Sequence, residues 1–117
     1  MSNSVPSVKL CRVVIGPETA ARIEGRFHLR EIDTVAVKGK TMPLRIYEPA
    51  EDELPHFAPY AEALECYRDR QFGAAVTLWE ALADDDGPSA VMAARARRYA
   101  EDPPSEDWSG VFVMAEK

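Results

Sequence analysis

The chain has 117 residues, 46% hydrophobic and 29% charged, which fits one small globular domain or one small unit with an appendage. Residues 1–49 carry eight basic and five acidic side chains, whereas residues 50–117 carry six basic and fifteen acidic ones. The acidic half repels nucleic acid and anionic lipid, which argues against both as partners. No apolar run approaches the roughly 20 residues that cross a bilayer, so we expect no membrane contact by this segment.

The cysteines and histidines are isolated in the sequence, as Cys11, Cys66, His28 and His56. This pattern predicts neither a disulfide framework nor a zinc site, and a reduced, cytoplasmic environment is expected. Residues 1–8 have neither the charged nor the apolar region of a signal peptide. We expect them to be a disordered leader.

The first elements predicted are a strand and a short helix. Residues 11–15 form a β-branched run that Gly16-Pro17 closes, which is typical of a buried strand. Pro17 suits the first turn of a helix, and residues 19–24 supply that helix.

Two extended stretches follow and predict a β-hairpin. Residues 27–37 are rich in strand-forming side chains, and residues 42–47 alternate apolar and polar side chains with the period of a half-buried strand. Between them, Lys38-Gly39-Lys40 interrupts the pattern with a glycine that can adopt positive φ.

The second half of the chain predicts helices. Residues 50–55 are polar and end in proline, which is typical of a linker. Beyond them, apolar residues recur at spacings of three and four, which predicts an αα-hairpin over residues 57–82 and a third helix over residues 89–99. Residues 108–114 are short and apolar and predict a strand or an extended segment lying on the helices.

Two segments, VVIGPETAARI and FHLREIDTVAVKGKTMPLRIYEP, together resemble the C-terminal end of a bacterial class III adenylate/guanylate cyclase catalytic domain. Members of this family typically finish with a strand, a short helix, and a strand pair that turns through V-K-G-K and ends in a tyrosine, here Tyr47. The resemblance implies that residues 9–49 are the C-terminal part of a cyclase domain. Residues 50–55 would then be a linker, and residues 56–117 an acidic helical tail.

The tail resembles the helical extension that some bacterial cyclases carry. Phe57–Leu82 resembles one tetratricopeptide (TPR)-type helical pair, with Tyr67, Phe72 and Trp79 near the expected places. The implied fold class is α+β: a short strand–helix–β-hairpin unit, followed by a TPR-like αα-hairpin and a third helix.

The resemblance implies an activity for a parent protein. Class III cyclases convert ATP or GTP to a cyclic nucleotide for signal transduction, using Mg or Mn ions held by two aspartates in a homodimer. The metal-binding, base-selecting and transition-state residues precede the matched segment in that family, and the only asparagine here is Asn3. We therefore expect a C-terminal fragment with no catalytic residue, metal ligand or cofactor of its own, in the cytoplasm or in the cytoplasmic part of a membrane-anchored parent.

One functional residue of the family matches a position in this chain. Lys38, the first lysine of V-K-G-K, corresponds to the lysine that contacts the terminal phosphates of the nucleotide. A lysine ammonium is a mobile point charge suited to a polyphosphate. The alternative is that Lys38 and Lys40 are solvated turn lysines that keep the hairpin soluble.

A function of another class stays open, in which the chain is a non-catalytic, TPR-like protein-interaction or regulatory module. A single helical pair buries little apolar surface and needs a neighbour. That neighbour would be the hairpin unit, another protomer or a target protein.

The remaining candidate residues have structural interpretations beside functional ones. The acids at 84–86 lack the spacing of a calcium loop, so a solvated helix end is expected. Tyr67 and Trp79 are expected in the core, whereas Trp108 either caps the helical hairpin or is offered to a partner. Three nearby arginines allow an anion site, but pairing with acids is the expected role of Arg95, Arg97 and Arg98.

Overall fold

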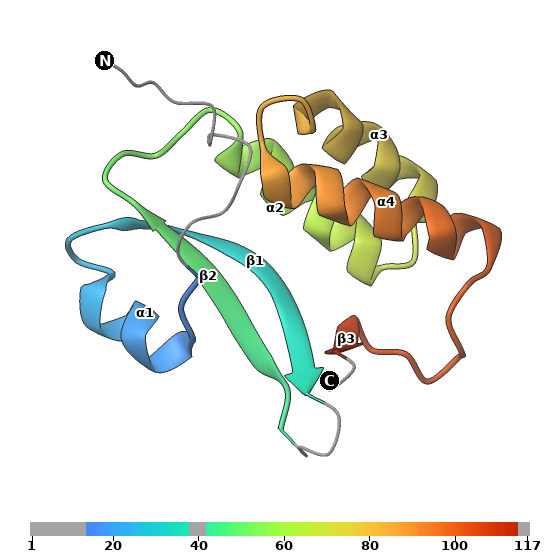
Figure 1. Cartoon of the computed structure of the whole chain (residues 1–117), viewed down its shortest axis with the longest axis horizontal. Coiled ribbons are helices and arrows are strands. Elements are labelled where there is room, and N and C mark those ends of the chain that lie inside the picture. The colour runs from blue at the N-terminus through green and yellow to red at the C-terminus, as the bar shows by residue number, and fades with distance from the viewer. Residues whose placement is uncertain (1–13, 38–41, 115–117) are drawn as a thin grey trace. The chain divides into compact units, whose positions relative to one another are not determined.

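The computed structural model describes residues 14–37 and 42–114 (Figure 1). In this part the fold class is α+β, with four helices and a three-stranded mixed sheet, which confirms the class expected. The elements in chain order are α1 (Pro17–Ile23), β1 (His28–Val37), β2 (Leu44–Ala50), α2 (Phe57–Arg68), α3 (Phe72–Leu82), α4 (Gly87–Glu101) and β3 (Val111–Met114).

The chain divides into two compact units. The helical unit comprises residues 58–104, and the sheet unit comprises the described residues of 14–57 and 105–114. Along the chain, the helical unit is therefore inserted between two segments of the sheet unit. No helix in residues 14–37 or 42–114 is both long enough and apolar enough to cross a membrane.

The hairpin forms as predicted, and its two strands pair antiparallel from Val35↔Leu44 to His28↔Ala50. The register shifts between Glu31 and Asp33, so β1 carries one extra residue there, as in a β-bulge.

Strand β2 is longer than predicted. It continues past Tyr47 to Ala50, through Pro49, which lies opposite Leu29 of β1. Proline lacks an N–H and is tolerated on edge strands, and β2 is the outer strand of the order β2-β1-β3. The expectation that the last hairpin strand ends at Tyr47 is wrong, because the pairing of β2 with β1 extends three residues further.

The short apolar segment near the end of the chain is a strand, β3, and its partner is β1. The two pair in parallel, from Thr34↔Val111 to Val37↔Met114. Residues 105–114 consequently group with the sheet unit and not with the helices that precede them. Periodicity alone gives no information on this partner, because pairing with β1 joins segments far apart in sequence.

In the helical unit, α2 and α3 are joined by a tight turn with two reverse hydrogen bonds. The N–H of Gln71 donates to the carbonyl of Cys66 (2.8 Å), and the N–H of Arg70 donates to that of Tyr67 (3.1 Å). This is the Schellman arrangement, in which the residue after the helix adopts a left-handed conformation. Arg70 takes that position with φ 66°.

An aromatic cluster holds the three helices of this unit together. Tyr60 and Tyr67 of α2 each lie 5.5 Å, centroid to centroid, from the ring of Trp79 on α3. Tyr99 of α4 lies 6.1 Å from Tyr67 and 5.4 Å from Phe72. Such tilted and offset pairs are favourable beyond the area they bury. Tyr67 and Trp79 are fully buried, as predicted.

Candidate functional site

The hairpin is the candidate site, because it leads into the segment that contains Lys38. Pairing of β1 with β2 ends at Val35↔Leu44, β1 itself ends at Val37, and residues 38–43 connect the two strands along the chain. Met42, in this connection, is 76% exposed. Lys38 and Lys40 lie outside the described residues, and the phosphate role of Lys38 stays a prediction.

The segment before α1 lies on the other edge of β2. The N–H of Ile15 donates to the carbonyl of Tyr47, and the N–H of Tyr47 donates to that of Ile15, both at 2.9 Å. Pro17 occupies the first turn of α1 and Glu18 lies near its positive end, as the sequence predicts. Residues 15–50 thus place an extended segment, a short helix and a hairpin in one sheet unit. The rest of the predicted strand at 11–15 lies largely outside the described residues.

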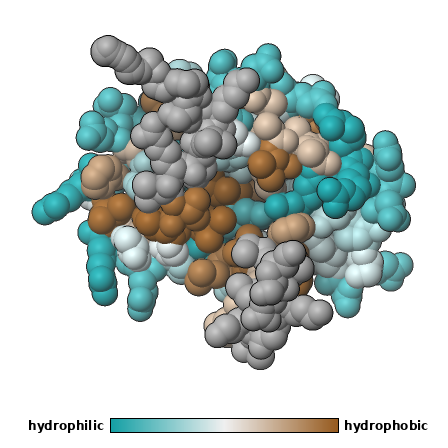
Figure 2. Space-filling view, viewed as in Figure 1, coloured by the Kyte–Doolittle hydropathy of each residue, from teal (hydrophilic) through white to brown (hydrophobic). Residues whose placement is uncertain are grey.

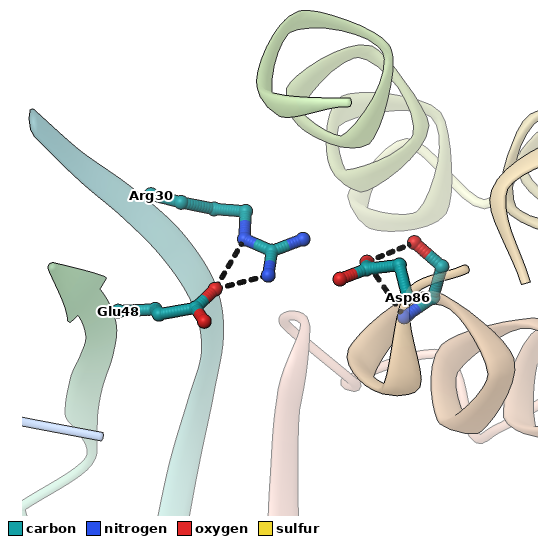
Figure 3. A network of polar contacts seen from close by, with 4 residues as sticks. Arg30, Glu48 and Asp86 are labelled. Carbon is teal, nitrogen blue, oxygen red and sulfur yellow. Dashed lines mark hydrogen bonds and ion pairs between the residues drawn. The ribbon is translucent and has the colours of Figure 1, made fainter. Parts of the chain in front are cut away.

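A buried ion pair joins the two hairpin strands. Arg30 on β1 lies directly opposite Glu48 on β2, and its Nε donates to Glu48 Oε1 at 2.9 Å (Figure 3). Arg30 Nη2 donates to the same oxygen. The side chain of Arg30 is only 3% exposed and that of Glu48 23%. The guanidinium also lies 5.3 Å from the centroid of the Phe57 ring, at cation–π distance.

Sequence reasoning missed this pair, although a signal was present. Once the hairpin register is fixed, Arg30 and Glu48 are cross-strand partners of opposite charge. The sequence does not tell that the Arg30 side chain is buried and that of Glu48 half-buried. Because Arg30 is held by a carboxylate and an aromatic ring, its role is to hold the hairpin together.

The hairpin also contains a second ion pair, between Arg45 and Glu31, and a buried aspartate, Asp33. Arg45 Nε lies 3.7 Å from Glu31 Oε2 in a largely exposed pair, which contributes little to stability. Asp33 is buried, and its Oδ1 accepts a hydrogen bond from the N–H of Thr34 at 2.8 Å. Within the described ranges, no three His, Cys, Asp or Glu side chains gather closely enough to hold a metal ion.

The acids at 84–86 do not act alike. Asp84 and Asp85 are exposed, whereas Asp86 is buried and caps α4. Its Oδ2 accepts from the N–H of Ser89 at 3.2 Å and from Ser89 Oγ at 2.6 Å (Figure 3). The expectation of a solvated helix end is correct for the first two acids and wrong for the third. The signal was the sequence Asp86-Gly-Pro-Ser89, an N-cap followed by proline in the first turn.

Two arginines of α4, Arg95 and Arg97, have protein partners. Arg97 pairs with Glu80 of α3, which confirms the expected pairing with acids. Arg95 Nη1 donates to the hydroxyl of Tyr67, at 3.2 Å. Trp108 is half-buried in the sheet unit, where its backbone N–H donates to the carbonyl of Ser105 at 3.0 Å.

Comparison with known proteins adds no relative to this picture. No family model, no curated protein and no solved structure matches the chain.

Proposed function

We propose that this chain supplies the C-terminal part of a class III adenylate or guanylate cyclase and is not catalytic alone. In this proposal the hairpin presents Lys38 to the terminal phosphates of ATP or GTP. The parent protein provides the Mg- or Mn-binding aspartates, the base-selecting residues and the transition-state residues, and acts as a homodimer.

The observation that carries the proposal is the order and pairing of residues 15–50. An extended segment at Ile15 pairs with Tyr47, α1 follows it, and the V-K-G-K sequence lies along the chain between the paired residues of β1 and those of β2. This is the order of elements that the resemblance implies for the end of a cyclase domain. The V-K-G-K motif is a feature of the sequence, and the order of elements is a feature of the structure. The two observations therefore support the proposal in different ways.

The sheet unit has a small apolar core among the described residues. Its buried apolar side chains in this part of the chain are Ala20, Ile32 and Phe57. Val14 and Leu44 are each 46% exposed, and Figure 2 shows apolar surface over the sheet. A sheet is normally covered by a second layer of structure. The remainder of a catalytic domain would provide that cover.

Two measurements test the proposal on the protein in its source cells. Antibodies raised against this chain should detect a larger polypeptide, and that polypeptide should form cyclic nucleotide with manganese. In it, Lys38→Ala should raise KM for the nucleotide about tenfold, because a lost charge-assisted contact is worth about 1.5–3 kcal/mol. Lys40→Ala is the matched control and should have a smaller effect. Equal effects of the two substitutions would refute the phosphate role of Lys38.

One observation favours the alternative, a non-catalytic interaction module. The helical unit forms a compact body with its own aromatic core, independent of the hairpin motif. If the antibodies detect only a polypeptide of the length of this chain, without cyclase activity, the interaction module becomes the better account.

A further inference from the structure

The third strand of the sheet, β3, is held differently from the other two. Among the described residues, it pairs with β1 through four residue pairs, whereas β2 pairs with β1 through seven. The β3 pairing is parallel, which is slightly less stable per residue than the antiparallel pairing of the hairpin. Within residues 14–37 and 42–114, β3 therefore has fewer pairs with β1 than β2 has, and the less stable type of pairing.

The side chains of β3 and its place in the chain also indicate that it is held less strongly than β2. Val113 is 59% exposed, whereas Val111 and Phe112 are half-buried, so docking of β3 buries only part of the apolar surface of these three residues. The whole helical unit lies in the chain between β1 and β3, so docking closes a far longer loop than the hairpin does. The entropic cost of docking is therefore larger for β3 than for β2.

The entry to β3 is nevertheless a defined structure. Gly110, the residue before the strand, is buried and has φ 92°, a conformation that favours glycine. The turn before it is closed by the hydrogen bond from Trp108 to Ser105. A defined turn followed by a weakly paired strand is suited to two states, one with the strand docked and one with it released.

We propose that β3 is a displaceable strand that leaves β1 while the β1–β2 hairpin stays intact. Release frees the edge of β1 at residues 34–37 for hydrogen exchange, while β2 stays paired with the other edge of β1. This device is independent of the cyclase proposal, since it concerns only pairing within the sheet.

A disulfide lock tests the proposal in the full chain. Val35 and Phe112 are opposite each other in the β1–β3 register, so both are replaced by cysteine in a Cys11→Ser, Cys66→Ala background. Hydrogen exchange is then followed residue by residue by NMR. In the reduced protein, amides of the β1–β3 ladder should exchange at least about tenfold faster than those of the β1–β2 ladder. Oxidation should remove that difference, and the reduced form is the matched control.

Two results would overturn the proposal. One is equal exchange rates of both ladders in the reduced protein, which would mean that the strand leaves only on unfolding of the whole sheet. The other is exchange of β3 at the rate of an unstructured peptide, which would mean that no docked state exists.

A second pair of variants covers the case in which the disulfide does not form. Neighbouring N–H groups of a strand point to opposite sides, so replacing both Phe112 and Val113 by proline removes at least one donor that faces β1. Phe112→Tyr with Val113→Thr keeps the donors and is the control. The proline variant alone should raise exchange in residues 34–37, with exchange in the rest of the hairpin unchanged. Loss of hairpin protection in the proline variant would contradict independent release.

Discussion

Arg30 and Glu48 face each other across β1 and β2, and two guanidinium nitrogens of Arg30 donate to one carboxylate oxygen of Glu48. The pair lies beside the Phe57 ring, with the arginine almost completely removed from solvent. A buried charge that loses its partner is costly, whereas exchanging a whole pair for apolar groups is often neutral. The two kinds of substitution therefore have different expected outcomes.

Glu48→Gln should destabilise the sheet unit by about 1–3 kcal/mol, because the buried Arg30 side chain loses its charge-assisted hydrogen bonds to Glu48. Arg30→Met with Glu48→Leu should cost less than Glu48→Gln alone. Urea unfolding followed by the fluorescence of Trp108, in a Trp79→Phe background, reports on the sheet unit. If the double variant has a lower free energy of unfolding than Glu48→Gln, the prediction is wrong. The ion pair would then contribute more to stability than apolar side chains in its place.

At Arg70, by contrast, we predict a substitution that increases stability. Its φ of 66° at the end of α2 favours glycine, so Arg70→Gly should stabilise the helical unit by about 0.5–1 kcal/mol. The exposed hydrogen bond from Arg70 Nη1 to the carbonyl of Pro104, at 3.3 Å, is lost in the process. Arg70→Ala loses the same bond but keeps the left-handed backbone, and serves as the control in denaturation followed by circular dichroism. Glycine less stable than alanine here would contradict the prediction.

The three consecutive acids before α4 provide a matched comparison. Asp86→Ala removes the acceptor of both hydrogen bonds from Ser89 and should cost about 1–2 kcal/mol. Asp84→Ala and Asp85→Ala, at exposed positions, should change stability by less than about 0.5 kcal/mol. Thermal unfolding of the three variants under one set of conditions measures the difference. Equal losses at all three positions would mean that only their summed charge matters.

Trp79 combines full burial with an indole N–H that has no hydrogen-bond acceptor among the described residues. Trp79→Ala opens a cavity between α2 and α3 and should cost about 3–5 kcal/mol. Trp79→Phe keeps much of the ring and removes the unsatisfied donor, so it should cost about 1 kcal/mol or less. Urea denaturation followed at the helical circular dichroism band compares them. A phenylalanine variant as unstable as the alanine one would indicate that the indole N–H has a partner after all.

The sequence predicts the elements of this chain better than it predicts their partners. Alternation of residues 42–47 and helical spacing around Trp79 are local signals, and the hairpin and the αα-hairpin follow from them. The pairing of β3 with β1 is a long-range contact that carries no periodicity. The extension of β2 through Pro49 depends on its place at the sheet edge, which a single strand pattern does not reveal.

The candidate site shows the same division. The resemblance around Lys38 comes from a motif and needs no three-dimensional information. The buried Arg30–Glu48 pair needs the hairpin register, and the different fates of Asp84 and Asp86 need the position of the α4 N-terminus. Identity and spacing alone do not distinguish a buried carboxylate from a solvated one.

Cyclic nucleotide formation measures the central claim most directly. Two samples are compared with manganese and either ATP or GTP: the 117-residue chain, and the native polypeptide isolated with antibodies against it. We predict no product from the chain by itself and cyclic nucleotide from the native polypeptide. Product from the 117-residue chain, or none from a native polypeptide that is intact and folded, would contradict the account.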